Sequence, residues 1–169
     1  AFGGSFRRIQ MTSDLLPSDI VGIMRLKQGT NEFEFREGPI FTHFLLADEL
    51  NRTSPKTQSA LLEAMAENTV TVDGTSRRLP DPFFVVATQN PLEFHGVYAL
   101  AESQLDRFML QLTLSSPEKA SELEIYQNPT LLKHLSLVAD DALTLNEALN
   151  LRREASQVHL EHSVLEYIT

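Results

Sequence analysis

Two short runs of consecutive apolar residues stand out in the chain, Phe44–Ala47 and Phe83–Ala87. Runs of this length are typical of strands in a parallel sheet whose two faces are both covered by helices. Residues 5–12 and 109–114 alternate between apolar and polar side chains and predict two further strands. We therefore expect an α/β fold built on a parallel sheet with flanking helices.

Two β-hairpins are expected beside this sheet. Segments 23–27 and 32–36 both alternate and are separated by a polar, glycine-containing turn. Residues 69–79 alternate around Asp73 and Gly74, and an Asp-Gly pair between alternating segments is a strong short-range signal for a hairpin. The first hairpin is inserted after a short helix predicted over residues 14–22.

The longest helix of the first part of the chain is predicted from Ser54 to Glu67, with Ser54 as N-cap and Pro55 in the first turn. Its buried stripe follows the spacing i, i+3, i+4 and i+7 and consists of Gln58, Leu61, Leu62 and Met65. A short helix is expected over residues 101–108.

From residue 115 onward only helices are expected. One covers residues 117–127, a second begins at the capping box formed by Thr144 and Glu147 and extends to about residue 158, and a third begins at residue 161. We place a domain boundary near Ser115, so that residues 1–114 form an α/β domain and residues 115–169 the start of a helical domain.

Polar residues follow both apolar strands, where parallel sheets bind their ligands. Asp48 and Glu49 end the first strand, while Thr88, Gln89 and Asn90 end the second. Of two adjacent carboxylates, one can hold Mg²⁺, directly or through water, while the other polarises an attacking water molecule. The alternative is that the two carboxylates only cap the helix that follows.

Composition narrows the classes of function. The formal net charge of −9 disfavours nonspecific binding to nucleic acid, because the summed field repels polyanions. The chain contains no cysteine, which excludes disulfides and thiolate metal sites. It has no run of 18 apolar residues, so no membrane span is expected, and the lack of a secretory signal favours a cytoplasmic location.

Several strings of residues, taken in order, resemble a MoxR-type AAA+ ATPase of the helix-2-insert group. The match extends over roughly residues 3–128. The strings are Asp14–Ile20, Gly38–Phe41, Leu46–Arg52, Lys56–Met65, Val70–Gly74, Ala87–Pro91 and Gln104–Phe108.

The resemblance implies a role for each matching residue of an ATP- and Mg²⁺-dependent site. Asp48 is the implied Walker B aspartate, which holds Mg²⁺ through its water shell, and Glu49 orients and polarises the attacking water. Asn90 is the implied sensor residue, and Arg107 the arginine finger that reaches the site of the next subunit. A finger acting in trans implies a homo-oligomeric ring, expected to be a hexamer.

The resemblance also implies partners. Members of this group work as chaperone-like ATPases that remodel or mature a protein client, or assist cofactor insertion, together with a partner carrying a von Willebrand factor A domain. The two hairpins are shared with magnesium-chelatase subunits and with minichromosome-maintenance helicases, where they face the pore or the substrate. A chelatase-like or helicase-like motor is therefore the alternative within the ATPases.

One motif of the family is missing from these residues. No Gly-x-x-x-x-Gly-Lys-[Ser/Thr] phosphate loop occurs, and in the family this loop lies just before the position that matches Ala1. We therefore expect the sequence to be a truncated piece, inactive as given, with an incomplete helical lid that stops before the second sensor arginine. The alternative for the piece itself is an interaction module that does not bind nucleotide.

The remaining cations and histidines have simpler interpretations. Arg7 and Arg8 are expected to be solvated, and His159 and His162 exposed rather than metal-bound. The pair Arg77 and Arg78 is either solvated or in contact with a substrate. Arg52 either contacts a neighbouring subunit or caps the next helix.

Overall fold

The computed structural model of the chain describes residues 3–90, 96–127 and 143–168. The chain divides into two compact units, one of residues 4–113 and the other mainly of residues from 114 onward. Pro91, the last residue of one motif string, lies outside the described residues. The assignment of the two units to an ATPase core and a lid stays a prediction.

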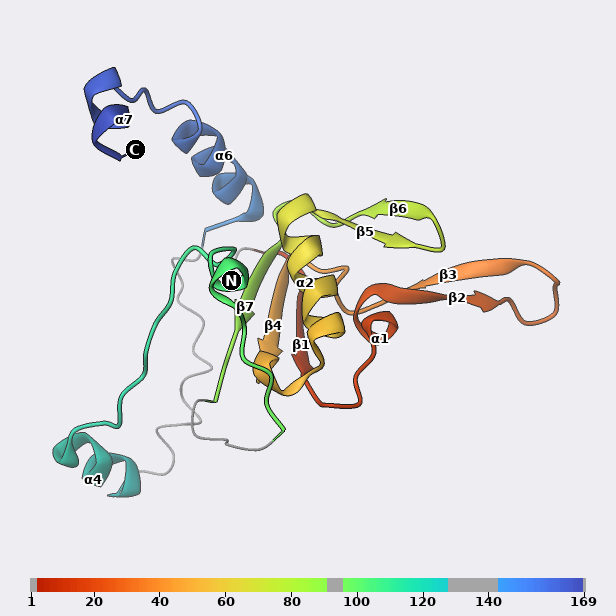
Figure 1. The fold of residues 1–169 in the computed structure, drawn as a ribbon, viewed down its shortest axis with the longest axis horizontal. Helices are drawn as coiled ribbons and strands as arrows, with labels where there is room; N and C mark the ends of the chain where they lie inside the picture. Colours follow the sequence, from red (N-terminus) through yellow and green to blue (C-terminus); the bar gives the residue numbers. More distant parts are fainter. Residues whose placement is uncertain (1–2, 91–95, 128–142, 169) are drawn as a thin grey trace. The chain divides into compact units, whose positions relative to one another are not determined.

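The first unit is built on a three-stranded parallel sheet (Figure 1). Its strands are β1 (Phe6–Gln10), β4 (Phe44–Asp48) and β7 (Phe84–Ala87), with β4 in the centre. The register places Gln10 opposite Asp48 and Arg8 opposite Leu46. The parallel sheet expected from the two apolar runs is therefore confirmed.

One face of the sheet packs against helix α2 (Pro55–Glu67), and the short helix α1 (Pro17–Val21) lies beside α2. The apolar core shared by these elements contains Met11, Ile20, Ile40, Leu45, Ala47, Leu50, Leu61, Ala64, Val70, Leu79 and Val85. Successive side chains of a strand point to opposite faces. Val85 accordingly enters the core, whereas Phe84 and Val86 remain 45% and 51% exposed.

This exposure corrects the expectation that the second apolar run is buried on both faces. The helices that the first unit packs against the sheet cover the Val85 side. A run of consecutive apolar residues predicts the strand correctly, but burial of its second face depends on what lies across that face.

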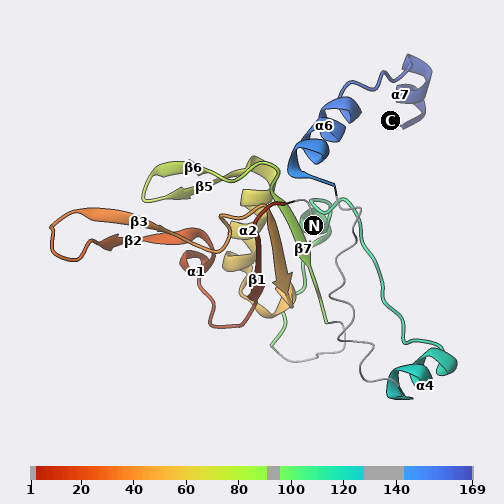
Figure 2. The ribbon, with the colours of Figure 1, turned by 180° about the vertical axis from the view of Figure 1, so that it is seen from behind.

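Both predicted hairpins are present, and they extend from the same side of the unit (Figures 1 and 2). The first joins β2 (Gly22–Leu26) to β3 (Phe33–Glu37), and the second joins β5 (Thr69–Val72) to β6 (Thr75–Arg78). Asp73 and Gly74 have φ values of 48° and 75°, as a type I′ turn requires.

Glycine is required where the first hairpin leaves the core. Gly22 has a φ of 103°, and a Cβ placed there would lie 2.4 Å from the carbonyl oxygen of Arg36. At Gly38 a Cβ would lie 2.1 Å from the carbonyl oxygen of Ile20. The two backbone segments therefore approach too closely for any side chain.

Helix α2 begins and ends as its sequence predicts. The Ser54 hydroxyl accepts a hydrogen bond from the backbone N–H of Thr57 at 3.3 Å. At the other end Asn68 takes the left-handed conformation, with a φ of 54°. A 3₁₀ turn, η1 (Leu50–Arg52), joins β4 to α2, and the helix expected over residues 101–108 is the short α3 (Glu102–Leu105).

The strand predicted over residues 109–114 is wrong. These residues have no regular secondary structure, and Leu114 is 95% exposed. Alternation gives a segment the side-chain pattern of a strand, but a strand forms only against a partner, and none of the described strands pairs with this segment.

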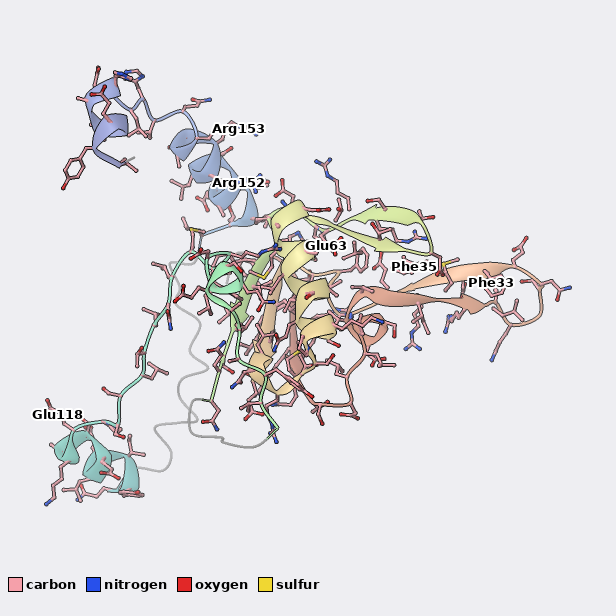
Figure 3. All side chains as sticks on the ribbon, viewed as in Figure 1. Phe33, Phe35, Glu63, Glu118, Arg152 and Arg153 are labelled. Atoms are coloured by element: carbon pink, nitrogen blue, oxygen red, sulfur yellow. The ribbon has the colours of Figure 1, made fainter. Side chains whose placement is uncertain are left out.

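The second unit contains helices α4 (Lys119–Gln127), α6 (Leu145–Ala155) and α7 (His162–Ile168). The capping box of α6 is confirmed, since Thr144 Oγ1 accepts from the N–H of Glu147 while the Glu147 carboxylate accepts from the N–H of Thr144. Arg152 and Arg153 lie in the last turn of α6, where cations complement the helix dipole (Figure 3). No helix in the described part of the chain has the length and apolar character needed to cross a bilayer.

Candidate functional site

Asp48 lies at the carboxyl end of the central strand and is 9% exposed. One carboxylate oxygen, Oδ2, accepts a hydrogen bond from Nε of Arg8 on the neighbouring strand β1. The other, Oδ1, accepts from the hydroxyl of Thr88 at 3.3 Å. The carboxylate is thus held from both neighbouring strands, by Arg8 of β1 and by Thr88 just after β7, and the positive charge of Arg8 offsets the cost of burying its negative charge.

Glu49 is held by different partners. Its Oε2 accepts from Nε2 of Gln10 at 2.6 Å and from Nη1 of Arg52 at 2.9 Å. Its backbone is left-handed, with a φ of 56°, and its N–H donates to the hydroxyl of Thr88 at 2.9 Å. A non-glycine residue in this conformation carries strain and is often found at functional sites. The carboxylates of Asp48 and Glu49 have different hydrogen-bond partners, although Thr88 contacts both residues.

The ends of strands β4 and β7 are joined at this point. Thr88 donates its N–H to the carbonyl of Ala47 at 3.0 Å, and its own carbonyl accepts from Leu50 at 2.9 Å. One residue further, Nδ2 of Asn51 donates to the backbone carbonyl of Asn90 at 3.2 Å. Asn90 itself is half-buried. Asp48, Glu49 and Asn90 are therefore brought to one edge of the sheet.

A buried amide of helix α2 supports the turn that follows Glu49. Gln58, which is fully buried, directs Nε2 at the carbonyl oxygens of Leu50 and Thr53, both at 3.2 Å, and of Tyr98 at 3.0 Å. These bonds tie the turn and the segment around Tyr98 to one helix. The expectation that Gln58 belongs to the buried stripe is confirmed, but the residue is polar because it satisfies loop carbonyls.

Arg107 is not part of this cluster. Its side chain is exposed, and Nη1 donates to the carbonyl oxygen of Leu62 in helix α2 at 2.8 Å. It lines a shallow groove on the outer side of α2 with Ser59, Leu62, Glu63, Ala66, Glu67 and Gln104. Within one chain, the structure therefore places Arg107 against α2 and not against the carboxylates.

Sequence reasoning missed three residues of the cluster. Arg8 was expected to be solvated, but it pairs with Asp48 although its own side chain is 65% exposed. Gln10 and Thr88 received no individual role. A signal was present for the first two, because Arg8 and Gln10 are two positions apart on one strand and so point to the same face of the sheet. Their partners could be identified only from the register between β1 and β4.

The expectations for the other histidines and arginines are confirmed only in part. His159 and His162 are exposed and lie near Glu161 and Glu166. Arg52 pairs with Glu49 within the chain. Of the arginine pair in the second hairpin, Arg78 is exposed, whereas Arg77 is partly buried, so solvation is wrong for Arg77.

The donor set at the sheet edge fits Mg²⁺ only together with other ligands. In the described ranges, no three His, Asp or Glu side chains converge as a metal site would require. Mg²⁺ is usually bound through one or two carboxylates plus water and substrate phosphates. Asp48, with a carboxylate at the end of the central strand, could serve as such a carboxylate ligand, with water and phosphates completing the coordination.

Comparisons with known proteins agree on one family. The family described as "ATPase family associated with various cellular activities (AAA)" matches residues 1–110. Among curated proteins, the chain is 48% identical to the uncharacterised protein YeaC of Bacillus subtilis over 99% of the chain and 52% of YeaC. It is 41% identical to chaperone MoxR1 of Mycobacterium tuberculosis over 98% of the chain and 43% of MoxR1.

A solved structure agrees as well. The crystal structure of a protein assigned as an ATPase from Cytophaga hutchinsonii superposes with a TM-score of 0.79 at 42% identity, covering 99% of the chain and 50% of that protein. The chain thus spans about half the length of the relatives it matches.

Proposed function

Because the chain belongs to the MoxR-type branch of the AAA+ ATPases, we propose that it supplies the catalytic carboxylates of a Mg²⁺-dependent ATPase that remodels or matures a partner protein complex. One observation carries this proposal. Asp48 and Glu49, adjacent in sequence at the end of the central strand, have carboxylates held by different side chains, and Thr88, just after the next strand, contacts both residues.

The proposal gives the two carboxylates different tasks. Asp48 would hold Mg²⁺ through its water shell, and the bound ion would offset negative charge on the phosphates. Glu49 would orient the attacking water and accept its proton. The different partners of the two side chains support this division, since Arg8 lies against Asp48 while Gln10 and Arg52 lie against Glu49.

Two residues would complete the chemistry from other positions. The side chain of Asn90 would hydrogen-bond the attacking water or the terminal phosphate. Arg107 would act on the site of a neighbouring subunit in a ring. Its observed hydrogen bond is to the carbonyl of Leu62 in its own chain, which leaves other donors of the guanidinium to act in trans. The phosphate loop that binds ATP is not among residues 1–169, so hydrolysis is proposed for the complete protein.

Further parts of the proposal concern assembly. We infer a homo-oligomeric ring, a protein client and a partner with a von Willebrand factor A domain. The relative named as a chaperone supports a protein client, and the net charge of −9 disfavours a nucleic-acid track. Stimulation of hydrolysis by DNA would instead favour a helicase-like motor.

The test is Mg²⁺-dependent ATP hydrolysis by the complete protein and its Asp48→Asn variant. Asp73→Asn, the same chemical change in an exposed turn that tolerates asparagine, is the matched control. We expect Asp48→Asn to lower turnover about 100-fold or more and the control to leave it unchanged. Circular dichroism checks that both variants fold. Turnover by Asp48→Asn within twofold of the control, or hydrolysis that persists in EDTA, would overturn the proposal.

A further inference from the structure

The first hairpin has one apolar and one polar face. Its register pairs Met24 with Phe35 and Leu26 with Phe33, and these four side chains share one face because directly opposed residues point the same way. The alternate pairs carry charge, and Arg25 forms a salt bridge with Glu34 at 2.6 Å on the other face.

The apolar face is covered only at its inner end. Phe35 packs edge-on against Phe41, which lies against the apolar core of the first unit, with ring centroids 5.6 Å apart. None of the residues that the structure describes covers the outer pair in this way, and Leu26 and Phe33 are 54% and 68% exposed. Figure 3 shows Phe35 nearer the body of the unit and Phe33 farther out on the same hairpin.

The cover over Phe35 comes from the second hairpin. The guanidinium carbon of Arg77 lies 3.9 Å from the centroid of the Phe35 ring, and Nη2 of Arg77 lies 3.9 Å from the sulfur of Met24. An arginine over an aromatic face within about 6 Å is a cation–π contact. Arg77 is thus the side chain of β6 that bridges to β2 and β3, two strands of a separate hairpin.

The guanidinium of Arg77 depends on this contact for its stabilisation. Its Nε is buried and has no hydrogen-bond acceptor among the residues that the structure describes, which is costly for a cation unless another interaction offsets the loss of water. The ring of Phe35 supplies that interaction. Arg78, the next residue, points to the other face of the second hairpin and is exposed.

The hairpin that carries Arg77 is itself firmly attached. Val70, opposite Arg77 in the register, is buried, as is Leu79. The N–H of Leu79 donates to the carbonyl of Asn68 at the end of α2, at 2.9 Å. Arg77 therefore projects from a stem that is anchored to helix α2.

From these contacts we propose that Arg77 is a positioning residue that fixes the first hairpin onto the second, so that the two hairpins move as one body. The second hairpin leads through Leu79 into strand β7, whose end carries Thr88 and Asn90. The contact between Arg77 and Phe35 therefore fixes the position of Leu26 and Phe33, at the outer end of the first hairpin, relative to the sheet that holds the proposed site. The inference concerns the hairpins and does not rest on ATP hydrolysis.

The test is hydrogen–deuterium exchange by mass spectrometry on the complete protein, comparing Arg77→Met with Arg78→Met. Methionine keeps an unbranched apolar side chain but removes the charge and the planar donor group. We expect exchange of residues 22–37 to become about 2- to 30-fold faster in Arg77→Met, which corresponds to the strength of a cation–π contact. Arg78→Met should change it less than twofold. Arg77→Lys, which keeps a cation, should restore part of the protection.

Two comparisons separate a specific contact from a general loss of stability. Exchange in α2, residues 55–67, should stay within twofold of the parent protein in Arg77→Met. In addition, Phe35→Leu should abolish the effect of Arg77→Met, so that the double variant exchanges no faster than Phe35→Leu alone. Equal acceleration in residues 22–37 and 55–67, an unchanged rate in residues 22–37, or effects that multiply in the double variant would each overturn the proposal.

Discussion

The buried amide of Gln58 offers a quantitative test of how the candidate site is held in place. Replacing Gln58 with leucine keeps the approximate size of the side chain. It removes the Nε2 donor that bonds the carbonyls of Leu50, Thr53 and Tyr98. These carbonyls belong to the turn after Glu49 and to the segment that follows β7. The substitution therefore affects the turn rather than the hydrophobic core.

The magnitude follows from counting donors and acceptors. The amide has two N–H groups, so it satisfies at most two of the three carbonyls at full strength. The bond to the Tyr98 carbonyl is only partly buried, so water can replace the lost donor there, whereas the bonds to Leu50 and Thr53 are buried. Leaving a buried acceptor without a donor costs about 1–3 kcal/mol. With two buried acceptors left unpaired, we expect Gln58→Leu to lower the free energy of unfolding by about 2–6 kcal/mol.

The assay is urea unfolding of the complete protein, followed by circular dichroism, with Glu63→Gln on the exposed side of the same helix as control. Gln58→Glu sharpens the test, because it places acceptors against acceptors and should destabilise more than leucine. A loss below about 0.5 kcal/mol for Gln58→Leu, or a glutamate variant as stable as the leucine variant, would refute the reasoning, since surface changes alone reach that size.

Two further predictions concern other parts of the chain. The hydrogen bonds from the Thr144 backbone and hydroxyl lower the pKa of Glu147. Because the pKa is lower in the folded state, these bonds stabilise α6 above the ordinary pKa of glutamate. The stabilisation is lost as the pH falls through the lowered pKa. The opening of residues 145–155, measured by amide exchange and corrected for the intrinsic exchange rate at each pH, should therefore increase as the pH falls through the lowered pKa of Glu147. Thr144→Ala, which removes the cap, should increase this opening about fivefold already at pH 7; equal opening at pH 7 would contradict the cap assignment. If Arg107 acts in trans, mixing inactive Arg107→Ala with inactive Glu49→Gln should restore about a quarter of the wild-type ATPase rate, because that share of randomly formed sites has both groups. A mixture that stays inactive while forming rings would contradict the trans role.

Local signals predicted the elements that depend on neighbours in sequence. The Asp73–Gly74 turn, the Ser54 cap and the capping box of Thr144 and Glu147 are all present, because each is decided within a few residues. The strand expected over residues 109–114 failed for the opposite reason. Its alternation was correct for a strand, but pairing depends on segments far away in the chain.

The same distinction applies to the candidate site. Asp48 and Glu49 could be named because they follow an apolar run that predicts a strand, whereas Asn90 is singled out from Thr88 and Gln89 only by the resemblance to MoxR-type ATPases. The pairing of Arg8 with Asp48 joins residues 40 positions apart, and the contact of Arg77 with the first hairpin depends on two hairpins meeting in space. Such contacts require the register and packing of the fold, which periodicity does not supply.

The central claim is that Glu49 activates water for ATP hydrolysis, and the most direct test compares binding with turnover in Glu49→Gln. Glutamine keeps the shape of the side chain and an oxygen that can accept from Gln10 and Arg52, but it cannot take up a proton at neutral pH. In the complete protein, we predict that labelled ATP binds within about threefold of the wild-type Kd while kcat falls about 100-fold or more. Glu63→Gln should alter neither quantity. A Glu49→Gln protein that turns over ATP within twofold of the wild-type rate would contradict the account.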